Sequence, residues 1–114
     1  MPEPVSRKNA EHYTWGEGCD GYFLLRRAEV HVIEERMPPG TKEKAHRHER
    51  ARQLFYVLEG ELTMRFEKGD VQIEHGAALE IEPGTVHQAR NESGRDVRFL
   101  VVSVPPSRGD RTDL

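Results

Sequence analysis

Turn-forming residues recur about every ten positions along the chain, and this spacing most constrains the fold. The segments between the turns are short and rich in Val, Ile, Leu and Phe. The turns are Pro38–Gly40, Glu59–Gly60, Lys68–Asp70, Pro83–Gly84 and Asn91–Gly94. Segments this short suit strands better than helices. The pattern predicts an all-β protein with the short antiparallel strands of a sandwich or small barrel.

The apolar segments between these turns are the candidate core. They are Tyr22–Ala28, Val30–Met37, Leu54–Leu58, Leu62–Phe66, Val71–Ile73, Leu79–Ile81 and Val97–Val104. A length of 114 residues suits one domain. We therefore expect a single domain over residues 1–114, with its core at about residues 20–104 and polar tails at both ends.

Composition argues against several classes of function. No run of 18 apolar residues is present and the N-terminus is polar, so the sequence predicts neither a membrane span nor a secretion signal. The net charge of −3 gives no overall basic excess for nucleic-acid binding. The single cysteine, Cys19, cannot form an intrachain disulfide, which favours a reducing, cytoplasmic location.

The Glu59–Gly60 turn predicts which side chains of its flanking strands share a face. As a two-residue hairpin it would pair Val57 with Leu62. Alternation then places on one face Gln53, Phe55, Val57, Leu62, Met64 and Phe66. The apolar residues of the other face, which need cover from the N-terminal strands or a second subunit, are Leu54, Tyr56 and Leu58. We expect a homodimer.

His46 and His48 are the first candidates for chemistry. Extended backbone places residues two apart on one face, about 6.6 Å from each other, so both imidazoles can reach one metal ion. Alone, the pair also fits two solvated histidines in a basic loop. Gln53 on the predicted inward face and His87, just after the Pro83–Gly84 turn, favour a metal site.

These segments resemble the two sequence motifs of the cupin superfamily. The first motif places a glycine before His-x-His, then an acidic residue and a second glycine, and the matching positions are Gly40, His46, His48, Gln53 and Gly60. The second motif is matched by Gly76, Gly84, His87 and Asn91. The resemblance implies a double-stranded antiparallel β-barrel, or jelly roll. It also implies one divalent transition metal bound by His46, His48, Gln53 and His87.

Two positions depart from these motifs. Glu82 replaces a proline beside Pro83 and should alter only the turn. Gln53 replaces the usual glutamate, so a divalent ion would keep its full charge and attract anions more strongly. An amide is also a weaker donor, which favours metal exchange and Lewis acidity. Gln occurs at this position in some cupin enzymes, including ones that resemble uronate ring-opening enzymes; the alternative is a degenerate cupin without metal.

The neighbouring residues suggest a pocket but no catalytic acid. Phe55 and Met64 share the face of Gln53 and are candidate substrate-binding residues, although core packing fits them equally. Lys44 shares parity with His46 and could hold a substrate carboxylate or form part of a solvated rim. Glu43 and Glu82 lie near the motifs, but alternation directs neither of them inward.

Two classes of function follow. The first is a metal-dependent enzyme, of the isomerase, ring-opening or dioxygenase type, that acts on a small anionic or hydroxy-carbonyl metabolite. The alternative is a non-catalytic, metal-containing module that binds or senses a small molecule. Mixed nitrogen and oxygen donors suit Zn, Ni, Mn, Fe or Cu and select none of them.

Overall fold

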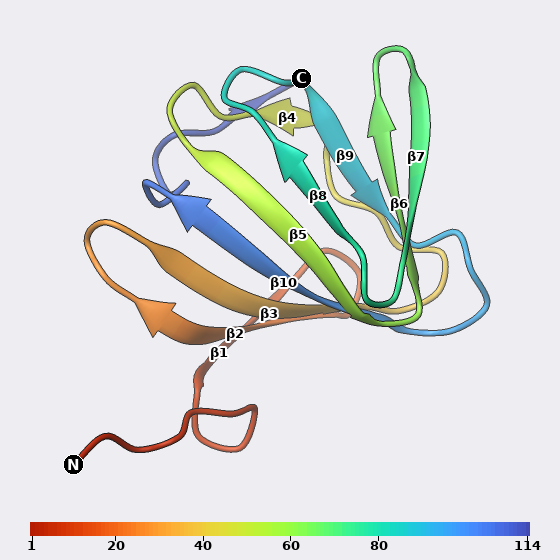
Figure 1. Ribbon diagram of the computed structural model, residues 1–114. Helices are drawn as coiled ribbons and strands as arrows, with labels where there is room; N and C mark the ends of the chain where they lie inside the picture. The colour runs from red at the N-terminus through yellow and green to blue at the C-terminus, as the bar shows by residue number, and fades with distance from the viewer.

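The computed structural model describes residues 1–114 as two facing antiparallel β-sheets (Figure 1). The six-stranded sheet has the order β1-β2-β3-β10-β5-β8 and the five-stranded sheet the order β11-β4-β9-β6-β7. The strands are β1 (Glu11–Trp15), β2 (Cys19–Arg26), β3 (His31–Met37), β4 (His46–Arg47), β5 (Arg52–Glu59), β6 (Glu61–Phe66), β7 (Gly69–Glu74), β8 (Ala78–Ile81), β9 (His87–Arg90), β10 (Val97–Val104) and β11 (Thr112–Asp113). The predicted all-β fold with antiparallel sheets is confirmed. No helix has the length and apolar character needed to cross a bilayer.

The predicted hairpin at Glu59–Gly60 is wrong. β5 pairs with β10 and β8, whereas β6 pairs with β7 and β9, so this turn carries the chain from one sheet to the other. Gly60 has φ +82°, and a Cβ there would lie 2.6 Å from the Asp96 carbonyl oxygen. Glycine is therefore needed at this crossing.

The faces inferred from the same strands are nevertheless correct. Gln53, Phe55 and Val57 of β5 are buried, and so are Leu62 and Met64 of β6. Alternation is a property of each strand by itself, and both strands face the same interior from opposite sheets. The side-chain directions therefore do not depend on which strand is the hydrogen-bonded partner.

The packed region of the interior lies between the two sheets. Its members without exposed surface are Cys19, Met37, Val57, Leu62, Met64, Val97 and Phe99. The Phe55 and Phe99 rings extend this region, with their centroids 5.7 Å apart. Dense burial of this kind supplies most of the stabilising free energy of a small β-protein.

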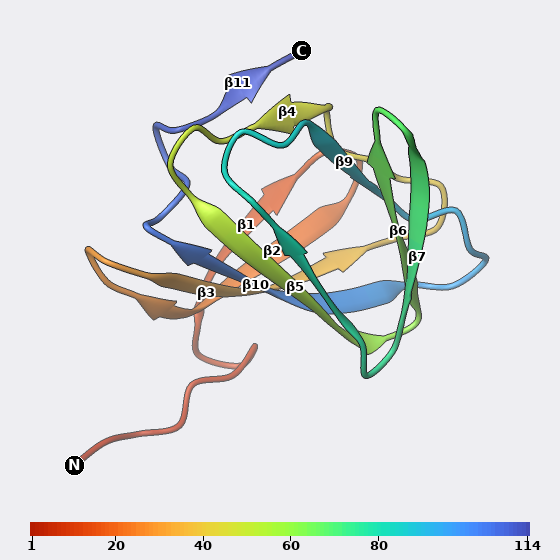
Figure 2. The same ribbon diagram turned by 45° about the horizontal axis from the view of Figure 1, so that its top comes forward.

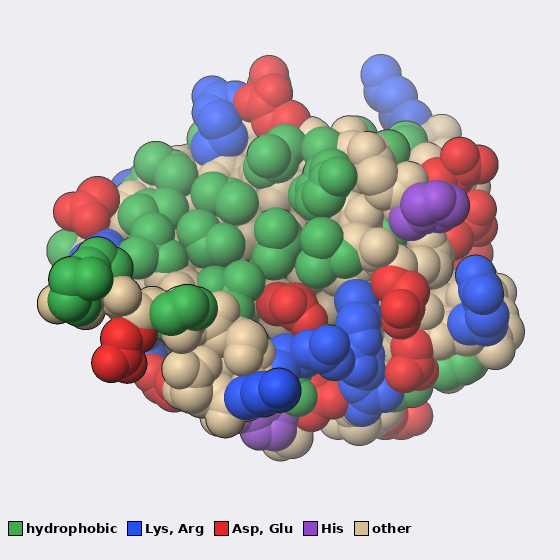
Figure 3. Space-filling view, turned by 60° about the horizontal axis from the view of Figure 1, so that its bottom comes forward, with side chains coloured by type: hydrophobic (Ala, Val, Ile, Leu, Met, Phe, Trp, Pro, Cys, Tyr) green, Lys and Arg blue, Asp and Glu red, His purple; other side chains and the backbone are tan.

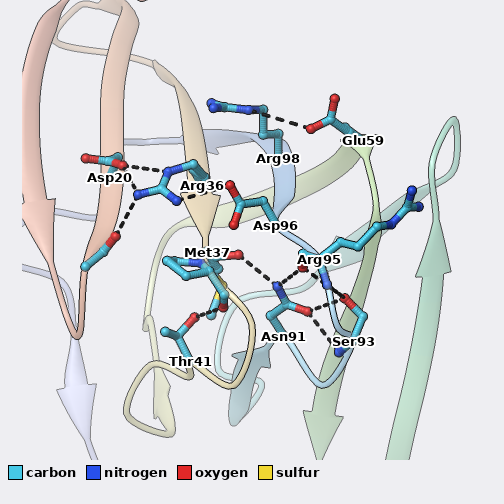
Figure 4. Close-up of polar contacts among 12 residues, drawn as sticks. Asp20, Arg36, Met37, Thr41, Glu59, Asn91, Ser93, Arg95, Asp96 and Arg98 are labelled. Atoms are coloured by element: carbon cyan, nitrogen blue, oxygen red, sulfur yellow. Dashed lines mark hydrogen bonds and ion pairs between the residues drawn. The ribbon is translucent and has the colours of Figure 1, made fainter.

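Asn91 closes the interior where the chain leaves β9 (Figure 4). Its side chain is 1% exposed, and its Nδ2 donates to the carbonyl oxygens of Met37 and Arg95 at 2.8 and 2.7 Å. Its Oδ1 accepts from the backbone N–H and the hydroxyl of Ser93. The Gly40 N–H donates to the Asn91 carbonyl oxygen at 2.9 Å. These two motif residues therefore hold the fold and lie apart from the histidines.

An exposed apolar patch lies on the outer face of the six-stranded sheet (Figure 3). Leu54, Tyr56 and Leu58 of β5 keep 41%, 38% and 43% of their surface accessible. Leu100 and Val102 of β10, the neighbouring strand, are half-buried beside them. The N-terminal strands do not cover this face, because β1 and β2 lie beyond β3 in the same sheet.

Candidate metal centre

His46, His48 and His87 converge in the interior of the protein. Figure 2 shows β4, on which His46 lies, beside β11 at one end of the fold. His46 on β4 and His87 on β9 are direct partners in the antiparallel register. One ring nitrogen from each histidine lies within 4.8 Å of those of the other two, and the side chains are only 1–5% exposed. The structure thus brings the three predicted histidines to a common point.

Backbone carbonyl groups fix the tautomer of all three imidazoles. The Nδ1 atoms of His46, His48 and His87 lie 2.7, 2.8 and 2.8 Å from the carbonyl oxygens of Lys44, Asp110 and Thr85, respectively. A carbonyl oxygen only accepts, so each Nδ1 carries the proton and donates. Each Nε2 then keeps a lone pair for a metal ion.

Burial keeps these imidazoles neutral. It lowers the pKa of His46 to about 3, with further lowering from His87, Arg111 and His48. Burial likewise lowers the pKa of His48 and of His87 below the ordinary value. Metal ions bind the neutral imidazole, so no proton has to leave these rings at neutral pH before binding.

Gln53 of β5 is buried and lines the same cavity as His46 and His48. Its Nε2 donates to the Ser103 hydroxyl at 3.0 Å, while its Oε1 is buried without a hydrogen-bond partner. The Nε2 of His87 is also buried and unpartnered. Buried polar atoms without partners are rare, and a cation beside them would satisfy both. The nitrogen and oxygen donors therefore fit a divalent transition metal.

A cavity of about 390 Å³ adjoins these donors. His46, His48, Gln53 and Phe55 line it, as do residues of the first three strands and of the C-terminal segment. Met64 has no exposed surface and belongs to the packed core. Lys44 is exposed and lines a second cavity, which shares Trp15, Glu43 and Arg111 with the first. Of the predicted pocket residues, only Phe55 lies beside the histidines in the first cavity.

Glu43 lines both cavities, contrary to the inference from alternation. It precedes β4 and belongs to no strand, so the rule of alternating faces does not apply to it. Its Oε2 accepts the Ala89 N–H at 2.8 Å and lies 4.0 Å from His46 Nδ1. Burial raises the pKa of Glu43 to about 8. Glu82, in contrast, is exposed.

The polar C-terminal segment is part of the site and not a free tail. β11 pairs with β4, and Arg108 and Arg111 line the cavity. The carboxylate of Asp110 accepts the N–H groups of residues 49–51, and its carbonyl oxygen accepts from His48. The polar composition of the C-terminal segment did not indicate these contacts, because their partners are distant in sequence.

The family model for the cupin domain matches residues 33–103. The chain belongs to the cupin family. The predicted double-stranded antiparallel β-fold of that family is confirmed. His46, His48, Gln53 and His87 all lie within the matched residues.

Relatives of this cupin differ in what their names describe. An oxalate-binding protein of Thermotoga maritima is 30% identical over 60% of this chain and 57% of its own length. Quercetin 2,3-dioxygenase of Bacillus subtilis is 32% identical over 68% of this chain but only 21% of its own length. A cupin sugar phosphate isomerase from Silicibacter pomeroyi has a TM-score of 0.80 at 22% identity, over 92% of this chain and 76% of that one. The structural likeness supports the fold alone.

Proposed function

We propose that this cupin is a metal-dependent enzyme that isomerises or ring-opens a small anionic hydroxy-carbonyl metabolite. The observation that carries the proposal is the cluster of three buried histidines, in which His87 Nε2 has no hydrogen-bond partner. The unpartnered Gln53 Oε1 belongs to a residue that lines the same cavity as His46 and His48. A divalent ion held by His46, His48, Gln53 and His87 would polarise an oxygen of the ligand. The adjoining cavity of about 390 Å³ leaves room for that ligand.

Arginines support the choice of an anionic substrate. Arg108 and Arg111 line the cavity from the C-terminal segment. The Arg108 guanidinium lies 5.5 Å from the centroid of the Phe23 ring, on the side of the cavity formed by the first strands. Four neutral donors would leave a bound divalent ion its full charge, which adds to the attraction for a carboxylate.

A non-catalytic ligand-binding protein is the second candidate, because one of the matched relatives is an oxalate-binding protein. Both candidates need the metal and a ligand. They differ in turnover, so an assay with a uronate, thiol and diketone panel separates them. Product formation with any compound of the panel supports the enzyme, and saturable binding without product supports the binding protein.

Metal content tests the centre itself. We expect purified wild-type protein to carry about one transition-metal ion per chain, and His46→Ala and His87→Ala each to lose it, because each removes a donor. His75→Ala is the matched control, since His75 is exposed and outside the site. Elemental analysis of folded, dialysed protein gives the result. Full metal content in both site variants would refute the assignment.

Gln53→Glu tests the role of the neutral amide. The variant should keep the metal but bind oxalate about tenfold more weakly, because the carboxylate lowers the positive charge of the centre. Isothermal titration with oxalate measures the change. Gln72→Glu adds the same charge on exposed β7 and should have no effect. Unchanged or tighter oxalate binding by Gln53→Glu argues against a charge-based role.

We also propose that the cupin forms a cytoplasmic homodimer. The exposed Leu54, Tyr56 and Leu58 on the outer sheet face support the dimer, because a second copy would cover them. Cys19 is free and buried, which agrees with a reducing compartment. Analytical ultracentrifugation at tens of micromolar should show a dimer, and monomer alone would contradict it.

A further inference from the structure

Tyr13, Gly21 and Glu35 form a row across the first three strands. In the antiparallel register Tyr13 of β1 lies opposite Gly21 of β2, and Gly21 lies opposite Glu35 of β3. Side chains of directly paired residues point to the same face of a sheet. The row therefore directs the Tyr13 and Glu35 side chains to one face, with a glycine between them.

Gly21 makes room for a hydrogen bond across this row. A Cβ at Gly21 would lie 2.1 Å from Tyr13 Cζ and 2.4 Å from the Tyr13 hydroxyl oxygen, so the phenol lies directly over the glycine. The hydroxyl donates to Glu35 Oε2 at 2.8 Å. Glycine weakens a strand interior and commonly marks a close approach of this kind.

Both ends of the hydrogen bond face the cavity of the candidate centre. Tyr13 and Glu35 line it together with His46, His48 and Gln53. The metal-centre histidines His46 and His87 belong to the five-stranded sheet, and Glu35 belongs to the facing six-stranded sheet. A ligand within this cavity could thus contact the metal centre and Glu35 at the same time.

The surroundings of Glu35 suit a group that both takes and gives a proton. Burial raises the pKa of Glu35 to about 7, against the lowering by the Tyr13 hydrogen bond and by Arg111. The other charged groups that face the pair are Glu43 and, near Tyr13, Arg108. Burial and Glu35 raise the pKa of Tyr13, so its hydroxyl stays a donor. A carboxyl group that titrates near neutral pH is well matched to general acid–base catalysis.

We propose that Glu35 is the catalytic base and acid that moves a proton between neighbouring carbons of a hydroxy-carbonyl substrate, with Tyr13 as its positioning residue across Gly21. This inference rests on the proposed function, since it requires the substrate to lie in the cavity of the metal centre. It adds the residue that transfers the proton, which neither cupin motif contains.

The step balances without an oxidant or reductant. The Glu35 carboxylate takes the proton from the carbon that bears the hydroxyl group, the C–H electron pair becomes the C=C bond of an enediolate, and the carbonyl π pair moves to its oxygen. Glu35 then returns the proton to the former carbonyl carbon, while the hydroxyl proton passes to the other oxygen. The product is the isomeric hydroxy-carbonyl compound, and the carboxylate is regenerated.

Solvent exchange tests the catalytic role of Glu35. Metal-loaded protein is incubated in D2O with galacturonate, glucuronate or dihydroxyacetone, and proton NMR follows the loss of the carbon-bound proton. Wild-type protein should exchange at least one of these, and Glu35→Gln should be at least about 100-fold slower with unchanged metal content. Glu34→Gln is the matched control, because Glu34 is the next residue of the same strand and points to the other face, where it pairs with Arg7.

A substrate-free measurement tests the pair itself. Carbon-13 NMR of glutamate-labelled protein should show one carboxyl that titrates near pH 7 and is absent in Glu35→Gln. Tyr13→Phe removes a donor to the carboxylate, so this midpoint and the rising limb of the pH–rate profile should both move upward. A Glu35 carboxyl that titrates near the ordinary pKa of 4.5 would overturn the proposal.

The outcomes separate this inference from the proposed metal centre. Exchange by wild-type and Glu35→Gln protein at equal rates overturns the role of Glu35 and leaves the metal-dependent activity standing. Metal-loaded wild-type protein that exchanges none of the three compounds also overturns it, while the metal assignment stands on elemental analysis. Failure of the wild-type protein to bind metal overturns the proposed function.

Discussion

The packed region and the cavity occupy parts of the same strands, but the side chains that face them differ in polarity. On β5, Val57 is fully buried among apolar side chains, while Gln53 contributes an unpartnered oxygen to the cavity. On β10, Phe99 belongs to the packed region and Ser103 to the cavity. All four side chains point inward. The comparison shows that position along a strand, as well as the face of the strand, separates stability from chemistry.

The largest expected effect is on the packed region. Phe99→Ala should lower the free energy of unfolding by about 3–5 kcal/mol, because it removes a fully buried ring and leaves a cavity. Chemical denaturation measures the loss. Leu100→Ala, on the half-buried outer face of the same strand, is the control and should cost clearly less. Equal losses would mean that the two faces of β10 contribute equally to the free energy of unfolding.

Asn91 should matter for stability and not for metal binding. Asn91→Ala leaves the buried carbonyl groups of Met37 and Arg95 without their donor and should cost about 1–3 kcal/mol. Denaturant titration gives the cost and elemental analysis the metal content. Asn9→Ala, in the exposed N-terminal segment, is the control. Metal loss in Asn91→Ala would show that Asn91 also supports the metal site, contrary to this separation of the two regions.

Ionisation of Glu35 should lower stability as the pH rises. The pKa of Glu35 is about 7 in the folded protein against 4.5 for an ordinary glutamate, so between these values the folded state binds more protons than the unfolded state. The Glu35 contribution to the free energy of unfolding should therefore fall from pH 4.5 to pH 7, by about 3 kcal/mol. The lowered pKa values of His46, His48 and His87 act in the opposite direction in metal-free protein. Urea titrations of metal-free wild-type and Glu35→Gln protein isolate this contribution as the difference between their pH slopes.

Glu35→Gln provides the control for this slope. The variant cannot ionise at this position, so the stability of the wild type relative to the variant should fall over this pH range. Glu43, whose pKa is also raised by burial, contributes in the same direction in both proteins. Identical slopes for the two proteins would show that Glu35 titrates alike in the folded and unfolded states.

The sequence predicted most of what depends on local pattern. Alternation in β5 and β6 directed Gln53, Phe55, Val57 and Leu62 inward, and the structure agrees. The spacing of His46 and His48 placed them on one face, and the resemblance to the cupin motifs predicted that His87 meets them, which it does. Both predictions depend on strand geometry and on motif spacing, which a sequence displays directly.

Features that depend on distant contacts were missed. A Glu59–Gly60 turn has the same local appearance in a hairpin and in a crossing between sheets, and only the packing of Gly60 against Asp96 distinguishes them. Glu43 lies outside any strand, and the partners of Asp110 are about 60 positions away. Gly21 inside an apolar strand was the one signal that could have revealed the Tyr13–Glu35 pair.

The hydrogen bond between His48 and the Asp110 carbonyl has a consequence for biosynthesis. The two residues are 62 positions apart, so a nascent chain that has exposed its histidines still lacks the group that orients one of them. Until Asp110 has been translated and has docked, His48 can rotate and protonate freely. A growing polypeptide should therefore compete poorly for metal ions on the ribosome, and loading should follow translation of this segment.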